Sequence, residues 1–152
     1  MRSWLLIVTA LAVLASLSAC EPRTDNPQRH IYCTVTGDPP ERDSDDAPRR
    51  IIAQVRYWCD KPGADSLTLT LRLQRRDARG VWRDVSRSTF TVRRGQTVRT
   101  DTQRYRVRQV AAACALGDYR TVVQGRSVAR GRTKTYSQTG VESHDPCTTF
   151  LH

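Results

Sequence analysis

Residues 50–59, RIIAQVRYWC, limit the fold of this chain more than any other stretch. Apolar side chains recur there at every second position, namely Ile51, Ala53, Val55, Tyr57 and Cys59. Polar residues such as Gln54 and Arg56 fall between them. A period of two places successive side chains on opposite faces of a β-strand. The stretch therefore predicts a strand with one face in a core, and no window after residue 20 shows the long apolar pattern of an amphipathic helix.

Further alternating stretches predict more strands beside this one. The clearest places Leu67, Leu69, Leu71 and Leu73 on one face, with Thr68, Thr70, Arg72 and Gln74 on the other. A DARG turn at residues 77–80 favours a hairpin into residues 81–85, and a second hairpin is predicted over 119–136, turning near 129–131. Short strands are predicted over 31–35 and 97–110, the latter with Tyr105 and Val107 inward. Alanines 111–113 favour a single helical turn within 107–116.

About seven short strands with turn signals roughly every ten residues predict an all-β fold, an antiparallel β-sandwich. The order Cys59, Trp82, Cys114 resembles the Cys, Trp, Cys order of immunoglobulin-like domains. Residues 114–120, CALGDYR, resemble a motif of small immunoglobulin-like proteins secreted by actinobacteria. This resemblance covers about residues 49–140 and implies an immunoglobulin-like sandwich. Trp58 and Trp82 are either core residues or an exposed platform for a sugar or peptide.

The first twenty residues predict export. A positive start, Met1-Arg2, precedes an apolar run over residues 4–17 that is shorter than the roughly 18 residues of a spanning helix, so it predicts a signal peptide. Residues 17–20, LSAC, resemble the lipobox of bacterial lipoproteins, in which the cysteine, here Cys20, is lipidated and becomes the first residue. Leu17 is too bulky for ordinary cleavage, although a cut after Ser18 remains the alternative.

The same reading divides the chain into three parts. Residues 1–19 are the predicted signal peptide, and residues 20–29, which are polar and contain Pro22 and Pro27, are a lipidated tether. Residues 30–152 form the β-sandwich domain, because their length suits one ordinary domain. Within it, residues 37–48 hold three prolines and five acidic residues and predict a solvated acidic loop rather than a calcium site.

The chain has five cysteines, and assigning Cys20 to a lipid leaves an even number for an oxidising compartment. Four cysteines allow three pairings. We predict Cys59 with Cys114, joining the ends of antiparallel strands, and Cys33 with Cys147, clasping the two ends of the domain. A rival to the second disulfide is a tetrahedral zinc site, because two H-x-x-C pairs supply His30, Cys33, His144 and Cys147.

The formal net charge is +10, and 23 of the 25 basic residues are arginine. Residues 49–152 carry 21 basic and 8 acidic residues, a net +13. Such a domain attracts anionic lipid or anionic polymers, although a GC-rich genome equally explains the arginine excess. Alternate residues of neighbouring strands predict one basic stripe, composed of Arg104, Arg106, Arg108, Arg120 and Arg126. The alternative is an ordinary solvated strand face.

No motif of a hydrolase, metalloprotease, phosphate-binding loop or dinucleotide site occurs in the chain, and no serine or cysteine is nominated as a nucleophile. We therefore predict a non-catalytic protein without a cofactor. Its expected role is that of a cell-envelope lipoprotein, a binding or accessory module on the outer face of the membrane. The alternative is a polyanion-binding surface protein. Expected partners are the membrane, through the lipid, and an envelope protein or anionic polymer, with no natural nucleic-acid partner.

Overall fold

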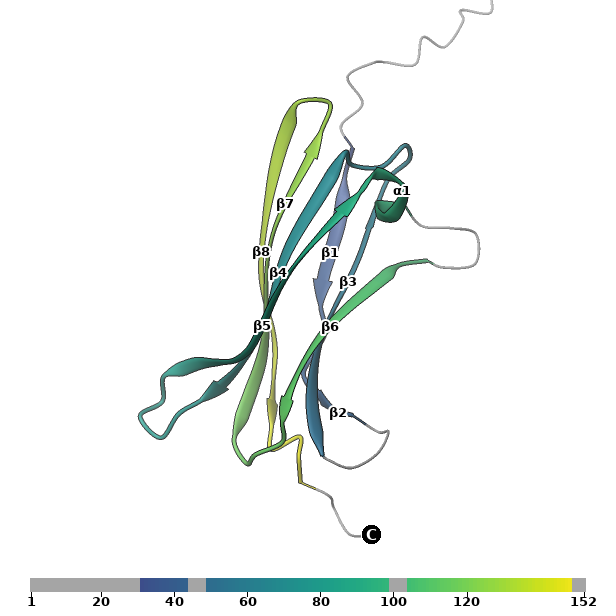
Figure 1. The fold of residues 1–152 in the computed structure, drawn as a ribbon. Coiled ribbons are helices and arrows are strands. Elements are labelled where there is room, and N and C mark those ends of the chain that lie inside the picture. Colours follow the sequence, from purple (N-terminus) through teal and green to yellow (C-terminus); the bar gives the residue numbers. More distant parts are fainter. Residues whose placement is uncertain (1–30, 44–48, 99–103, 149–152) are drawn as a thin grey trace, which may run out of the picture.

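Two antiparallel β-sheets face each other in the computed structural model, which describes residues 31–43, 49–98 and 104–148 (Figure 1). The predicted signal peptide, Cys20, the tether over 20–29 and His30 lie outside the described residues. No helix among the described residues is long and apolar enough to span a membrane. The two antiparallel sheets confirm the predicted all-β fold with two layers.

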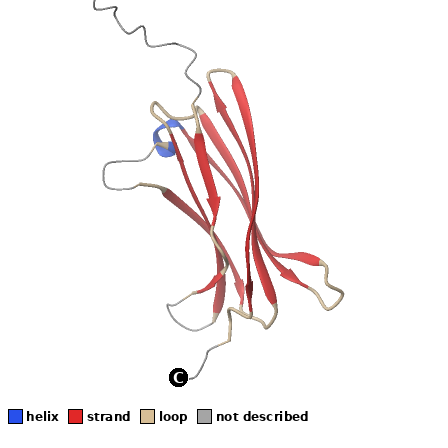
Figure 2. Cartoon of the chain, turned by 180° about the vertical axis from the view of Figure 1, so that it is seen from behind, coloured by secondary structure: helices blue, strands red, loops and turns tan. Residues whose placement is uncertain are grey.

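Sheet A is centred on β3 (Arg50–Cys59), which pairs antiparallel with β6 (Arg106–Ala113) on one side. On its other side lie β1 (Cys33–Gly37) and the two-residue β2 (Glu41–Arg42). Sheet B has the order β5 (Trp82–Arg93), β4 (Ser66–Arg76), β7 (Asp118–Ala129) and β8 (Arg132–His144). The chain passes between the sheets after β3, after β5 and after β6, so each sheet contains segments from both halves of the domain (Figure 1). Seen from behind, the strands make up nearly all of the described chain (Figure 2).

The core lies where the inward faces of β3 and β4 meet. The predicted inward residues of β3 are 1% exposed or less, and so are the four predicted leucines of β4. Val92, Tyr119 and Val123 add to the same cluster. Each fully buried leucine or valine stabilises the fold by about 1.5 to 3 kcal/mol relative to an exposed one. The two alternating stretches therefore supply nine of the sixteen buried residues of the core cluster.

Both predicted hairpins are present. Between β4 and β5, the amide of Gly80 donates to the Asp77 carbonyl at 2.9 Å, and Gly80 has a φ of +78°. Hydrogen bonds from the backbone of Val81, the side chain of Arg83 and the backbone of Arg79 hold the pKa of the Asp77 carboxyl below its ordinary value of 3.8. Between β7 and β8, Arg130 and Gly131 both have positive φ, as a two-residue turn that matches the twist of its strands requires.

The predicted helical turn within residues 107–116 is wrong. Residues 106–113 form β6, whose backbone pairs with β3 over its whole length. The short helix is instead α1 (Arg94–Thr97), which connects β5 towards β6. Pairing with a neighbouring strand overrides the helix preference of alanine because each backbone group of β6 facing β3 finds a partner there.

The predicted disulfide pairing is also wrong, although all four cysteines are in disulfides. Cys33 is bonded to Cys59, and Cys114 is bonded to Cys147. Because β6 runs antiparallel to β3, Cys114 lies beside the start of β3, where its amide donates to the Arg49 carbonyl. Cys59 lies at the other end of that ten-residue strand, about 30 Å away. A disulfide requires Cα atoms within about 7 Å, so Cys59 and Cys114 are out of reach of each other.

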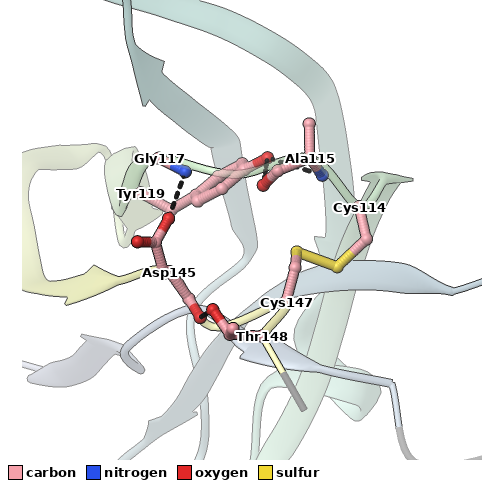
Figure 3. Close-up of a disulfide and its surroundings, with 7 residues drawn as sticks. All are labelled: Cys114, Ala115, Gly117, Tyr119, Asp145, Cys147 and Thr148. Atoms are coloured by element: carbon pink, nitrogen blue, oxygen red, sulfur yellow. Dashed lines mark hydrogen bonds between the residues drawn. A yellow bond between two sulfur atoms is a disulfide. The ribbon is translucent and has the colours of Figure 1, made fainter.

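The Cys114–Cys147 disulfide belongs to a clasp between the turn that precedes β7 and the segment that follows β8 (Figure 3). Asp145 accepts a hydrogen bond from the Gly117 amide and donates its own amide to the Gly117 carbonyl. The hydroxyl of Tyr119 donates to the Ala115 carbonyl at 2.9 Å and accepts from the Ala115 amide at 3.2 Å. The disulfide and these hydrogen bonds together hold the turn in which the chain crosses from β6 of sheet A to β7 of sheet B.

The zinc alternative is excluded for this fold. Cys33 and Cys147 belong to different disulfides, so their sulfurs are not available as thiolates. Within residues 31–43, 49–98 and 104–148, no group of three or more His, Cys, Asp or Glu residues is placed to hold a metal ion. His144 instead contacts two carboxylates, Asp118 and Asp145.

Candidate binding surface

The five arginines of the predicted basic stripe do not form one stripe. Arg106 and Arg108 are on β6 of sheet A, whereas Arg120 and Arg126 are on β7 of sheet B. Arg104 is exposed and precedes β6. The stripe required β6 and β7 to be neighbours in one sheet, and the chain crosses to the other sheet between them.

The direction of the β6 side chains is also the reverse of the prediction. Arg106 and Arg108 lie opposite Tyr57 and Val55 of β3, and residues opposite each other share a face, so both arginines point to the inward side of sheet A. Tyr105 and Val107, predicted inward, are 42% and 39% exposed. Arginine can point inward here because β6 is an edge strand. The apolar part of the side chain passes beside the core, and the charged end stays near water. The guanidinium of Arg108 lies 6.0 Å from the Phe90 ring centre.

Arginines gather instead on the outer face of sheet B. Burial of the four leucines of β4 directs Thr68, Thr70 and Arg72 outward, and the strand register carries this face across the sheet. Arg76 lies there at the end of β4, where it donates to the Gly80 carbonyl. Five further arginines occupy the face, and we call this set the basic face: Arg72, Arg87, Arg93, Arg120 and Arg126. They come from the three strands β4, β5 and β7.

The basic face contains a pair of like charges. Arg72 of β4 and Arg87 of β5 are directly opposite in register, an arrangement that destabilises a sheet unless a counter-charge is present. The Nε atom of Arg72 is buried and has no hydrogen-bond partner. Among the described residues, none of Arg72, Arg87, Arg93 and Arg126 forms an ion pair with a protein carboxylate.

Acidic side chains are missing on one side of this pair, whereas on the other side Asp84 and Glu142 lie in the next row, with Gln74 and Arg120. The four strand segments that make up the upper part of the face, residues 66–72, 87–93, 122–128 and 133–139, contain no Asp or Glu. Hydroxyl and amide groups fill the rest of it. Thr68 is hydrogen-bonded to Thr91 at 3.2 Å and Thr70 to Thr89 at 3.0 Å, while Gln124 and Ser137 continue the second row. The surface is therefore polar and positively charged.

The lower end of the basic face is held by a network within the protein. Arg120 donates from Nε to Gln74 at 2.8 Å, and Gln74 in turn donates to Asp84 at 2.7 Å. The Arg120 guanidinium lies 4.3 Å from the Trp82 ring centre. This stacking places Trp82 half-buried on the outer face of sheet B, rather than against a disulfide, and fixes Arg120 at the edge of the positive region.

Trp58 is the other predicted platform residue, and it lies half-buried on the outer face of sheet A. The same face has a shallow hollow of about 410 Å³ lined by Asp38, Glu41, Gln54, Arg56 and Tyr105 among others. Arg56 donates to Asp38 at 2.9 Å, which raises the pKa of its guanidinium. Gln54 donates to Glu41 at 3.0 Å. Because these groups satisfy one another, the hollow presents fewer free donors than the basic face.

Sequence reasoning found Arg120 and Arg126 but missed the other three arginines of the basic face. Arg72 was already visible on the polar side of the leucine alternation. Arg87 and Arg93 needed the register between β4 and β5, including the irregularity between Leu73 and Gln74. No protein-family model matches this chain, and no curated protein is similar to it in sequence.

Proposed function

We propose that the protein is an exported lipoprotein whose β-sandwich acts as a non-catalytic binding module at the outer face of the cell membrane. The carrying observation is the use of cysteine. The domain pairs Cys33 with Cys59 and Cys114 with Cys147, which leaves the lipobox-like Cys20 as the single cysteine without a disulfide. Two disulfides indicate an oxidising environment outside the cytoplasm, where a lipid-anchored domain is found.

The proposal includes kinship of the sandwich with immunoglobulin-like domains. Its support is the connectivity, with β1, β3 and β6 in one sheet and β5, β4, β7 and β8 in the other. The hydroxyl of Tyr119, near the start of β7, bonds back to the Ala115 backbone four residues upstream. A tyrosine at this corner is a recurrent feature of such sandwiches. The disulfides depart from the pattern, since neither joins β3 to β7.

Replacement of Cys20 by Ala tests the anchor. We expect the wild-type protein to partition into the detergent phase with a mature mass that includes the lipid, and the C20A variant to stay as uncleaved precursor or to leave the membrane fraction. A Cys20→Ala protein that retained the wild-type mass and partitioning would refute the anchor. A second variant, Leu17→Ala, changes the predicted signal peptide but keeps Cys20. It therefore tests recognition of the lipobox separately from attachment of the lipid.

A further inference from the structure

We propose that the basic face of sheet B binds a linear polymer that carries a phosphate group in each repeat. The inference deepens the proposed function, on which it rests, by assigning a ligand class and a surface to the binding module. Its starting point is the Arg72 and Arg87 pair, two adjacent positive charges with no carboxylate in residues 66–72, 87–93, 122–128 and 133–139 of the surrounding strands. A phosphate placed between them supplies the missing counter-charge and accepts from both guanidinium groups, including the unpartnered Nε of Arg72.

The spacing of the face suits a chain rather than a single ion. Along a strand, residues on one face are about 6.7 Å apart, and neighbouring strands are about 4.8 Å apart. By the register, Arg93 and Arg126 lie one row apart, Arg72 and Arg87 share a row two further on, and Arg120 is in the next. The arginines therefore span about 27 Å, and the part without carboxylates, from the row of Arg93 to the row of Arg72 and Arg87, is about 20 Å long. An extended polymer crossing it meets several charges in succession.

The row without arginine also fits this ligand. Thr89, Thr70, Gln124 and Ser137 occupy it in the order of the strands. Hydroxyl and amide groups donate hydrogen bonds to phosphate oxygens and to the hydroxyl groups of a polymer backbone. The side chains that flank the arginines thus continue the same recognition, and the carboxylates of the face, Asp84 and Glu142, lie beyond them in the row of Arg120.

A polymer fits better than a membrane surface because the face lacks apolar anchors. Proteins that lie on bilayers combine basic residues with exposed apolar side chains that enter the interface. The exposed large hydrophobic residues of the described chain lie elsewhere, on the edges and loops, and the valine opposite Arg72 on the basic face, Val122, is 6% exposed. Charge without apolar insertion favours a hydrated, flexible partner.

The test uses the purified full chain and long-chain inorganic polyphosphate as probe. The face variant replaces Arg72, Arg87 and Arg126 with Gln. The matched control replaces Arg49, Arg50 and Arg104, which are exposed and belong to the sheet A side, so that both variants lose the same charge. We expect the face variant to bind at least tenfold more weakly at about 0.15 M salt. In a plot of the logarithm of the binding constant against the logarithm of the salt concentration, the slope should become about 2 less steep, because each of the three lost phosphate contacts contributes roughly 0.7 to it.

The control should retain wild-type affinity within about twofold, since weak steering by net charge is screened at this salt concentration. Equal loss in both variants would mean that binding follows total charge and not this face, and would overturn the proposal. So would stronger binding to vesicles of mixed zwitterionic and anionic phospholipid than to polyphosphate. Wild-type chain that does not bind polyphosphate at all also removes it.

Amide chemical shifts provide a measurement that does not depend on a variant folding. On adding short-chain polyphosphate to wild-type protein, shifts should concentrate in residues 68–72, 87–93 and 122–126. Shifts concentrated in β6 or in the hollow of sheet A would contradict the assignment. A failure of the proposed lipid anchor can be distinguished from a failure of the proposed binding face, because an unlipidated protein would still bind polyphosphate through this face.

Discussion

Gly63 shows how a single residue sets the packing of the loop between β3 and β4. Its φ is +94°, and a Cβ atom built there would lie 2.6 Å from Val98 Cγ2 and 2.7 Å from Thr97 Oγ1. Both the backbone conformation and the space therefore exclude a side chain. This close approach brings the helical turn α1 against the end of β3, where Val98 bridges to Cys59.

Replacement of Gly63 by Ala is expected to lower the free energy of unfolding by about 1 to 3 kcal/mol, because the new methyl group is both strained and overpacked. Denaturant unfolding measures the change. Gly95→Ala is the matched control, since nothing lies within 4 Å of a Cβ atom there and its backbone is helical, and it should be neutral or slightly stabilising. Equal losses in the two variants would show that Gly63 has no special role.

His144 makes the stability of the clasp depend on pH. A hydrogen bond to Asp118 and the nearby charge of Asp145, whose Oδ2 lies 3.3 Å from His144 Nε2, raise the pKa of His144 above its ordinary value of 6.5. A raised pKa in the folded state means that the contribution is fully present below about pH 6.5 and is lost as the pH rises through the folded value.

We therefore expect His144→Gln to lower the melting temperature at about pH 5.5 and to have little effect at about pH 8.5. The side chain is largely exposed, so the difference is small. Thermal unfolding of both proteins across this pH range measures it. A larger destabilisation at the alkaline end would mean that the neutral ring, rather than the charged one, makes the contact that matters.

At the scale of elements, Tyr119 fixes the crossing from β6 to β7. Its ring is 1% exposed, and its hydroxyl bonds both backbone groups of Ala115. Tyr119→Phe keeps the buried ring but leaves the Ala115 groups with one partner fewer each. We expect a loss of about 1 to 3 kcal/mol. Hydrogen exchange at the Ala115 amide should accelerate more than exchange in the middle of β4, whereas uniform acceleration would indicate a global effect instead of a local one.

The elements that sequence reasoning predicted well are those whose two faces differ strongly in polarity. Residues 50–59 and 67–73 were assigned correctly as strands and by face because every inward position is apolar. The inward and outward faces of β6 were predicted the wrong way round. Arginine and valine alternate in this edge strand, and an arginine side chain at an edge can lie on either face because its charged end still reaches water. The cysteine pairing required knowledge of which strand neighbours β3, and alternation within one strand carries no such information.

The candidate site was predictable only in part, for the same reason. Composition indicated a basic surface, and the alternation of β4 indicated which way Arg72 points. The gathering of arginines depends on the order β5, β4, β7 in sheet B, because that order places residues 15 to 58 positions apart in sequence opposite one another, from Arg72 with Arg87 to Thr68 with Arg126. Local patterns specify the faces of strands, whereas strand neighbours are specified by long-range packing.

At the scale of the whole molecule, two disulfides divide the domain into separately stapled parts. The paired cysteines are 26 and 33 positions apart in sequence, for which the chain-entropy model gives about 3 to 4 kcal/mol each. We expect reduction to lower the melting temperature markedly and a metal chelator to leave it unchanged. Removing each pair separately, with Cys33→Ala/Cys59→Ala or Cys114→Ala/Cys147→Ala, should lower it by comparable amounts.

Mass mapping of non-reduced tryptic peptides tests the pairing itself, because arginines separate all four cysteines into different peptides. Peptides that contain Cys33 and Cys59 should be linked, and so should those that contain Cys114 and Cys147. A link between Cys59 and Cys114 would contradict the antiparallel placement of β6 on β3, and with it the division of the basic residues between the two sheets.

The position of the Cys33–Cys59 disulfide has a mechanical consequence for an anchored domain. Cys33 is the first residue of β1, a five-residue edge strand, and it lies opposite the last residue of β3. Tension applied through the chain that precedes β1 would otherwise peel this strand away one hydrogen-bonded pair at a time, starting from that pair. The covalent bond lies at the point where peeling would begin, so a pull on the chain that precedes β1 is transmitted to the central strand of the sheet.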